Sequence, residues 1–148
     1  MKVALACDHG GYPLRERLLE VLAGCGAEVV DLGTFTPDPV DYPDYAEALG
    51  LAILQGRAER GVLVCGSGVG ATVAANKLPG IRAGCCHDCF SAHQGVEDDD
   101  CNVLCLGARV IGPEAAADIV KIFLGATFSG AERHRRRVGK VAILEEKY

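Results

Sequence analysis

The stretch at residues 62–70 constrains the fold of this chain more than any other part of its sequence. The β-forming residues Val62–Val64 lead into Cys65, three glycines then alternate with small residues, and residues 71–77 read as a helix. A buried strand that turns on glycines into a helix leaves several backbone N–H groups pointing into one small space, which suits an anion. Cys65 stands at the edge of this turn, where a thiolate would also be favoured.

Strand and helix patterns alternate along the whole chain. We expect strands at residues 2–7, 28–32, 61–65, 81–86 and 102–106. We expect helices at about 14–22, 45–55, 71–77, 90–97, 112–124 and 130–146. This alternation predicts a three-layer α/β/α Rossmann-like fold of about five parallel strands with a C-terminal helix. Residues 33–44 contain three prolines and read as a loop. No repeat or linker divides the chain, so we expect one domain over residues 1–148.

The composition describes a globular domain rich enough in apolar residues for a sheet buried on both faces. Of the 148 residues, 49% are hydrophobic and 24% are charged. No apolar run is long enough to span a membrane and no signal-peptide pattern precedes the first strand, so we expect a cytoplasmic protein. The net charge of −5 argues against nucleic acid and anionic membranes as general partners. The exception is local, because four of the 15 Lys and Arg residues lie within residues 133–137 and suggest a specific small anion.

The eight cysteines raise the question of a metal site. Cys86 and Cys89 have the two-residue spacing of a metal or redox motif, and Cys101 with Cys105 could supply a second pair. However, Cys105 alternates within an apolar strand and should point into the core. We therefore expect buried thiols rather than a disulfide framework, and neither a bound metal nor another cofactor.

Ligands of parallel sheets bind beyond the carboxyl ends of the strands. Five segments with polar residues fall at this edge of the expected sheet: residues 8–9, 33–45, 65–70, 87–88 and 107–109. The polar candidates therefore converge on one edge.

Two interpretations of the glycine turn compete. Gly66, Gly68 and Ala71 fit the spacing of a dinucleotide fingerprint, and Asp88 lies near the expected distance downstream, which would make the chain a nucleotide-binding module. However, the turn follows the third strand instead of the first, and 148 residues leave no second domain for a substrate. The cysteine at the strand end and the arginine cluster also stay unexplained.

The second interpretation uses all of these parts. An enzyme that moves a proton between adjacent carbons of a sugar phosphate needs a base, donors for the enediolate oxygens and a grip on the phosphate. Cys65 could be the base, the amides of residues 66–70 could hold the enediolate, and Ser67 could move a hydroxyl proton. Arg133 and Arg137 lie four residues apart on one helical face and could hold the phosphate together.

Each of these residues also has a plainer interpretation. Cys65 could be a small buried core residue, which is the commoner fate of cysteines. The arginines could form a solvated helix surface, and we prefer this interpretation for Arg135.

A series of motifs runs in order along nearly the whole chain: Asp8–Gly11, Asp41–Pro43, Cys65–Gly70, Ala74–Lys77, Gly80–Ala83, Asn102–Leu104, Gly107–Gly112 and Arg133–Arg137. In this combination they resemble the ribose-5-phosphate isomerase type B family, which includes the galactose-6-phosphate isomerase subunits. The resemblance implies aldose–ketose isomerisation through a cis-enediol, without a metal, on a Rossmann-like fold. It also implies a homodimer, possibly a tetramer, with active sites built across the subunit interface.

The resemblance assigns roles to individual residues. Cys65 matches the family's base, which moves a proton between C1 and C2, and Ser67 stands where many members have threonine, which keeps the hydroxyl. The substrate-contacting positions of the family match Asp8 and His9, Tyr42, the loop Gly66-Ser67-Gly68-Val69-Gly70, Asp99, Arg109, and Arg133 with Arg137. Some of the arginines are expected to reach the site of the partner subunit.

One pair of residues departs from the family pattern. Members usually carry a His-Asn pair before the fifth strand, and the histidine is credited with opening the furanose ring; here Asp98 and Asp99 stand at these positions. An aspartate serves as an acid or base only if its pKa is raised well above about 4, which neighbouring carboxylates favour and solvent exposure opposes. Either ring opening uses Asp98 or His9, or the substrate does not cyclise as ribose 5-phosphate does.

The sequence thus predicts a sugar-phosphate isomerase that interconverts ribose 5-phosphate and ribulose 5-phosphate. A four-carbon or six-carbon sugar phosphate is the alternative substrate, and a nucleotide-binding module is the alternative from another functional class.

Overall fold

The protein, described by a computed structural model over residues 1–148, is built around one parallel sheet. Its five strands are β1 (Lys2–Cys7), β2 (Glu28–Asp31), β3 (Arg60–Cys65), β4 (Ala83–Cys85) and β5 (Val103–Gly107). The six helices are α1 (Tyr12–Gly24), α2 (Tyr42–Leu54), α3 (Val69–Ala75), α4 (Cys89–Asp99), α5 (Pro113–Gly125) and α6 (Glu132–Lys147). The strands lie in the order β2-β1-β3-β5-β4, and every neighbouring pair is parallel.

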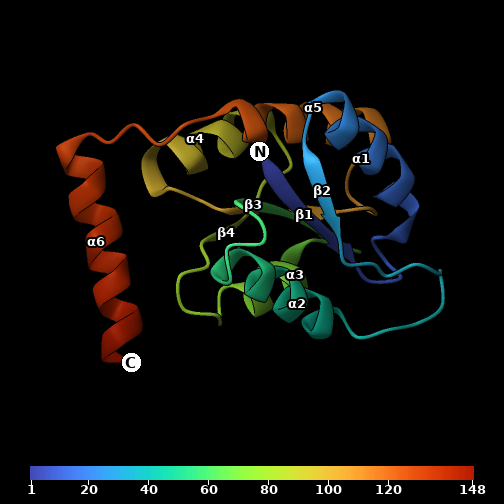
Figure 1. Cartoon of the computed structure of the whole chain (residues 1–148), viewed down its shortest axis with the longest axis horizontal. Coiled ribbons are helices and arrows are strands. Elements are labelled where there is room, and N and C mark those ends of the chain that lie inside the picture. The colour runs from blue at the N-terminus through green and yellow to red at the C-terminus, as the bar shows by residue number, and fades with distance from the viewer.

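Helices cover both faces of the sheet, which confirms the predicted three-layer architecture. Figure 1 shows α1, α4 and α5 along one face, α2 and α3 along the other, and α6 apart from both layers. The strands supply alternate residues to each side, as the period of two requires. In β1, Val3 and Leu5 join the core under α1 and α5, whereas Ala4 and Ala6 face the α2 and α3 layer. The core is therefore two apolar layers separated by the sheet.

The register places the ends of the central strands side by side. Cys65 at the end of β3 pairs with Gly107 at the end of β5, and Val64 pairs with Cys7 at the end of β1. The turns that follow these three strands consequently meet at one edge of the sheet, as predicted from the β-α alternation.

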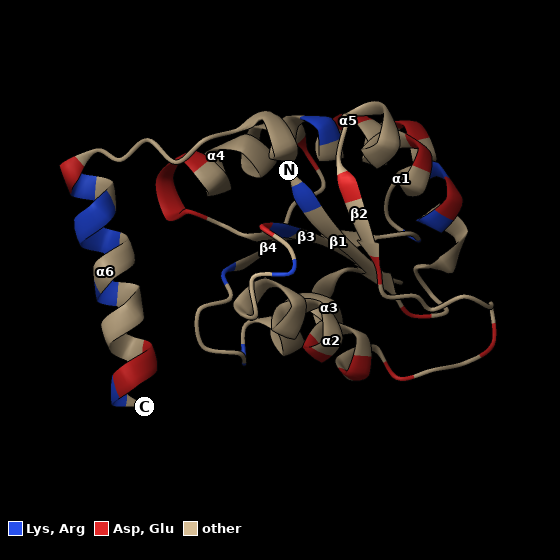
Figure 2. Ribbon diagram, viewed as in Figure 1, with Lys and Arg blue, Asp and Glu red and all other residues tan.

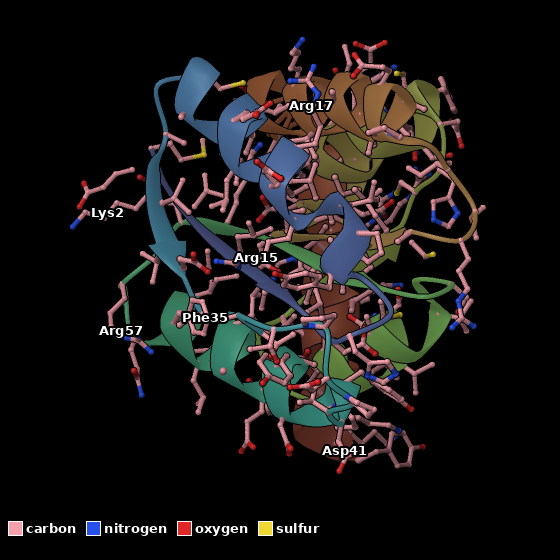
Figure 3. The ribbon with its side chains drawn as sticks, turned by 90° about the vertical axis from the view of Figure 1, so that its right-hand side faces the viewer. Lys2, Arg15, Arg17, Phe35, Asp41 and Arg57 are labelled. Carbon is pink, nitrogen blue, oxygen red and sulfur yellow. The ribbon has the colours of Figure 1, made fainter.

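Helix α2 begins earlier than the sequence predicts. We expected residues 33–44 to be a loop, but the helix starts at Tyr42 and includes Pro43 and Asp44. Proline fits the first turn of a helix because its missing N–H would have no partner there. The loop between β2 and α2 therefore ends at Asp41, at the lower edge of the molecule in Figure 3.

The acidic residues 98–100, which follow the fourth helix expected from the sequence, are helical in part. Helix α4 continues through Asp98 and ends at Asp99, and the residue that caps it, Asp100, has a left-handed φ of 50°. Strand β4 is shorter than expected, because Ile81 and Arg82 lie before its first residue. Asp98 and Asp99 therefore belong to the last turn of a helix that we expected to end at residue 97.

The loop between β2 and α2 is anchored by the side chain of Arg15. Its guanidinium donates to Asp31 Oδ1 at 2.7 Å and lies 4.9 Å from the centre of the Phe35 ring. Figure 3 shows Arg15 and Phe35 near each other beside the end of β2. The ion pair lowers the pKa of Asp31, chiefly through the hydrogen bond from Arg15.

Helix α6 has little contact with the two layers. His134 is its only buried residue, and the helix packs mainly against α4. None of the helices is both long and apolar enough to cross a membrane.

Arg60 ties the end of α5 to the sheet, and we expect its loss to destabilise the fold. Its guanidinium donates to the carbonyl oxygens of Phe123 at 2.6 Å and Ala126 at 2.8 Å, which otherwise have no helical partner. Because such hydrogen bonds involve a charged donor, Arg60→Ala should lower the free energy of unfolding by about 2 kcal/mol, measured by urea denaturation. Arg57→Ala, in an exposed loop, should change it by less than about 0.5 kcal/mol; equal effects of the two substitutions would refute this role for Arg60.

Candidate active site

The turn after β3 directs a backbone donor at the thiol of Cys65. The Gly68 N–H donates to Cys65 Sγ at 3.1 Å, and Cys65 is only 5% exposed. Gly68 has a φ of +80°, and a Cβ there would lie 2.9 Å from Cys85 Sγ and 3.0 Å from the carbonyl carbon of Leu106, so only glycine fits. The amides of Gly66, Ser67 and Gly70 make no hydrogen bond within the chain. The turn thus presents unused N–H donors next to a thiol.

Ser67 contributes a hydroxyl at the same place. Its Oγ accepts a hydrogen bond from the Val69 N–H at 3.2 Å. Since this bond uses a lone pair of the oxygen, the hydroxyl proton stays available to a ligand.

A cavity of about 310 Å³ opens above this turn. It is lined by Asp8, Tyr42, Cys65, Gly66, Ser67, Gly70, Arg109 and Val110. Four separate segments of the chain therefore meet at one cavity, and seven of its eight residues are among those predicted from the sequence. Val110 was not singled out, although it lies within a matched motif.

The turn after β5 supports the glycine loop from below. The Ala108 N–H donates to the Cys65 carbonyl and the Arg109 N–H to the Gly66 carbonyl, both at 2.9 Å. The Arg109 side chain runs along Gly66, with its Nε 3.6 Å from where a Cβ would be. These contacts bring one guanidinium to the wall of the cavity.

The turn after β1 supplies the opposite wall. Asp8 is 7% exposed, and its Oδ1 accepts a hydrogen bond from the Gly11 N–H at 2.9 Å. His9 does not line the cavity; its Nδ1 accepts a hydrogen bond from the Val40 N–H at 3.1 Å, so a neutral ring carries its proton on Nε2.

Tyr42, in the first turn of α2, closes the cavity from the side. A Cβ on Gly70 would lie 2.9 Å from Cζ of the Tyr42 ring, so the ring covers this glycine directly. The sequence placed Tyr42 near the site, but in a loop.

A second set of predicted residues lies elsewhere in the chain. Arg133 and Arg137 are exposed on α6, and Asp98 and Asp99 are at the end of α4. Figure 2 shows the basic turns of α6 next to the acidic end of α4, at some distance from the turns after β1 and β3. The chain thus brings the thiol and the glycine loop together, and keeps the arginines of α6 and the two aspartates apart from them.

Asp98 and Asp99 have different surroundings. Asp98 Oδ2 accepts a hydrogen bond from Gln94 Nε2 at 2.8 Å, and its Oδ1 lies 3.4 Å from His134 Nε2. Asp99 lines a hollow of about 720 Å³ that separates α6 from the body of the protein.

The segment after β4 has structural roles that sequence reasoning did not assign. His87 Nε2 accepts a hydrogen bond from the Gly107 N–H at 2.8 Å, which holds the end of β5 under the glycine loop. Asp88 caps α4 by accepting from the Ser91 N–H at 2.7 Å, and the hydrogen bonds from Ser91 lower its pKa. Asp88, which fitted a dinucleotide fingerprint in the sequence, therefore acts as the N-terminal cap of a helix. An isolated histidine and aspartate carry no spacing signal by which these contacts could be predicted.

The cysteines do not form a metal centre in this structure. No three His, Cys, Asp or Glu side chains come together in a geometry that would hold a metal ion, and all eight cysteines are free thiols. Cys105 is fully buried, as predicted. Burial raises the pKa of the Cys7 and Cys101 thiols to about 11 and that of Cys105 to about 12, so all three stay protonated at neutral pH.

We expect thiol alkylation to single out Cys65 among the buried cysteines of the central strands. Iodoacetamide reacts with thiolates, and raised pKa values leave almost none of that form at Cys7 and Cys105 at pH 8. Cys65 instead faces an open cavity with an N–H directed at its sulfur. Peptide mass spectrometry of the folded protein should find Cys65 modified, with Cys7 and Cys105 protected until the protein is unfolded. Equal labelling of all three would contradict this arrangement.

Comparisons with known proteins identify related chains over the full length. The protein-family model described as Ribose/Galactose Isomerase matches residues 3–141. Ribose-5-phosphate isomerase B of Escherichia coli is 42% identical over 146 residues, covering 99% of this chain and 97% of the relative. D-erythrulose-4-phosphate isomerase of Pectobacterium atrosepticum is 39% identical over 134 residues, covering 88% of this chain and 86% of the relative.

The solved structures that this chain resembles include further ribose-5-phosphate isomerases of type B. Ribose-5-phosphate isomerase B of Clostridium thermocellum is 44% identical and superposes with a TM-score of 0.97, covering 100% of this chain and 99% of the other. The enzyme of Mycoplasma genitalium with bound ribulose-5-phosphate is 35% identical and superposes with a TM-score of 0.93, covering 99% of this chain and 97% of the other.

Proposed function

The chain belongs to the ribose/galactose isomerase family, and we propose that it interconverts ribose 5-phosphate and ribulose 5-phosphate. The observation that carries this proposal is the thiol of Cys65, set in a cavity that is also lined by Gly66, Ser67 and Gly70, whose backbone N–H groups have no partner in the chain. A base beside fixed donors is what proton transfer next to a carbonyl requires. The names of the Escherichia coli relative and the ligand of the Mycoplasma genitalium structure support the choice of substrate.

In this mechanism Cys65 is the base. Its thiolate takes the proton from C2 of the aldose, the electron pair of that bond forms the enediolate double bond, and the carbonyl oxygen at C1 takes the negative charge. The resulting thiol then returns the proton to C1, which yields the ketose. The Gly68 N–H, 3.1 Å from the sulfur, stabilises the thiolate before the first transfer.

The glycine loop stabilises the intermediate. The N–H groups of Gly66, Ser67 and Gly70 are free to donate to the two enediolate oxygens, which carry more charge in the transition state than in the substrate. Donors fixed in a turn need no reorganisation as this charge develops. The Ser67 hydroxyl, which belongs to the same turn, moves the proton between O1 and O2.

Four further residues hold the rest of the substrate. The second oxygen of Asp8 binds a sugar hydroxyl inside the cavity, and Nε2–H of His9 binds one that extends beyond it. The Tyr42 ring limits the length of the bound chain. Arg109 is the one cation that lines the cavity, and it faces the phosphate. A phosphate dianion bound by a single guanidinium would be only half neutralised, so further cations are needed.

A second copy of the chain supplies those cations in this proposal. Arg133 and Arg137 are exposed on α6 and lie outside the cavity of their own chain. In a homodimer they reach the cavity of the partner and complete its phosphate site. Pairs of such dimers would form the tetramer that the sequence also allows.

Exposed apolar surface supports this association. Helix α6 leaves Val141, Ile143 and Leu144 between 48% and 59% exposed, and α3, next to the cavity, leaves Val69 and Val73 at 59% and 56%. Apolar patches of this kind on a soluble chain mark contact surfaces. Association through them would place α6 of one copy beside α3 of the other, where the glycine loop begins. As a cytoplasmic enzyme, this dimer would meet phosphorylated sugars directly.

Replacing Cys65 by alanine tests the assignment of the base. Cys65→Ala should lower kcat by about 10³-fold, within the range for loss of a general base, because the thiol assigned to the C2 proton is lost. The affinity for inorganic phosphate, measured by calorimetry, should stay within about twofold because the phosphate contacts are intact. Cys25→Ala, an exposed cysteine at the end of α1, is the matched control and should keep full activity. A Cys65→Ala variant with most of its turnover would exclude Cys65 as the base.

A four-carbon sugar phosphate is the second candidate substrate. The relative from Pectobacterium atrosepticum bears the name of an isomerase for D-erythrulose 4-phosphate. In a four-carbon aldose 4-phosphate the oxygen at C4 is esterified and cannot close a furanose ring. Such a substrate needs no ring-opening acid, which agrees with Asp98 at the position where the family carries histidine.

Comparison of kcat/KM across four-, five- and six-carbon aldose phosphates separates the two candidates. We expect the highest value for ribose 5-phosphate, in line with the name of the Escherichia coli relative. A higher value for the four-carbon substrate would replace the first candidate by the second. Turnover of none of them would reject the proposed function.

A further inference from the structure

Three side chains from separate segments meet at the base of α6. His134 is 6% exposed, and its Nδ1 lies 2.6 Å from Ser129 Oγ, in the connection that follows α5. On the other side of the ring, Nε2 lies 3.4 Å from Oδ1 of Asp98 on α4. We call this set, Ser129, His134 and Asp98, the α6 clasp.

Each outer member of the clasp is itself held. Ser129 donates its backbone N–H to the Glu97 carbonyl at 2.9 Å, and its Oγ accepts from the Ala131 N–H at 3.2 Å. Asp98 accepts from Gln94 Nε2 at 2.8 Å. The imidazole therefore bridges two fixed points, one before α6 and one on α4.

The clasp controls where α6 leaves the body of the protein. A hollow of about 720 Å³ lies between α6 and the body, so close packing does not set the direction of the helix. Apart from the clasp, the far end of α6 is held by Glu145, whose carboxylate accepts from the Gly80 N–H at 3.1 Å. A helix that is attached mainly at its two ends rotates relative to the body of the protein if either attachment is lost.

The arginines lie on one flank of the clasp. At 3.6 residues per turn, Arg133 and Arg137 are about 100° and about 60° around α6 from His134, both to the same side. Arg135 lies about 100° to the opposite side. A rotation of α6 about His134 would thus displace Arg133 and Arg137 in the same direction, whereas Arg135 lies on the other flank of the helix.

We propose that His134 is a positioning residue that sets the location of Arg133 and Arg137 for the phosphate of the substrate. This role rests on the proposed function, in which these arginines complete the phosphate site of a partner chain. It also gives Asp98 a defined partner within its own chain, because both carboxylate oxygens are engaged, one by Gln94 and one by His134. His134 does not touch the substrate, and acts only through α6.

A positioning role predicts a specific kinetic signature. The phosphate does not change during the reaction, so displacement of its ligands weakens binding more than it slows proton transfer. His134→Ala should raise KM for ribose 5-phosphate about tenfold and raise the inhibition constant of inorganic phosphate in parallel, with kcat within about threefold. Arg135→Ala is the matched control on the opposite flank, and should leave both constants within about twofold.

Conservative variants distinguish positioning from general stability. His134→Gln keeps an acceptor for Ser129 and an N–H for Asp98, and should restore most of the affinity lost in His134→Ala. Ser129→Ala removes one contact and should show an intermediate KM. Melting temperature and mass in solution, recorded for every variant, show whether the fold and the dimer are kept.

Each outcome has a definite meaning. A folded His134→Ala with an unchanged KM, or with a reduced kcat at unchanged KM, would overturn the positioning role while the proposed function stands. Unfolding of all three variants would also overturn it, by making the clasp a purely structural element. Lack of isomerase activity in the wild type would reject the proposed function itself, and this inference with it.

Discussion

The close approach of three strand ends is the constraint on which the rest of this structure depends. A Cβ on Gly107 would lie 2.5 Å from the carbonyl carbon of Ser67, and one on Gly10 would lie 3.0 Å from the Gly66 nitrogen. Gly11 leaves no room for a side chain against the Val64 carbonyl. The turns after β1, β3 and β5 pack backbone against backbone here, and this places Asp8, Cys65 and Arg109 around one cavity. Glycine at these positions is therefore the basis of the site.

The chain keeps its reactive thiol and its exposed arginines in two separate places. The cavity around Cys65 has unpaired backbone donors but only Arg109 as a cation, while Arg133 and Arg137 stand on α6 beyond a hollow. A chain with a net charge of −5 gains by concentrating cations where an anion must bind, because the rest of its surface repels that anion. The separation of Cys65 from Arg133 and Arg137 within one chain is the physical reason why association is central to the proposed function.

The fold was largely predictable from the sequence, because it rests on local patterns. Alternating apolar residues in β1 and β3 and the glycine turn after Cys65 carry strong signals, and the structure confirms the parallel sheet and its two helical layers. The start of α2 was missed because the prolines around Tyr42 suggested a loop. Seven residues of the cavity were predicted as well, since strand ends of a parallel sheet must meet. The contacts of His87 with Gly107 and of His134 with Ser129 and Asp98 were not, because they join single side chains without any periodicity.

The central claim is that isomerisation proceeds by proton transfer to a protein base through an enediolate. The most direct test is to run the wild-type reaction from ribose 5-phosphate in D₂O and to examine C1 of the ribulose 5-phosphate formed by NMR. A thiol that exchanges with solvent between the two transfers would place deuterium at C1 in a measurable fraction of turnovers. Product without any solvent deuterium after many turnovers would indicate direct hydride transfer between the carbons, and would contradict the role given to Cys65.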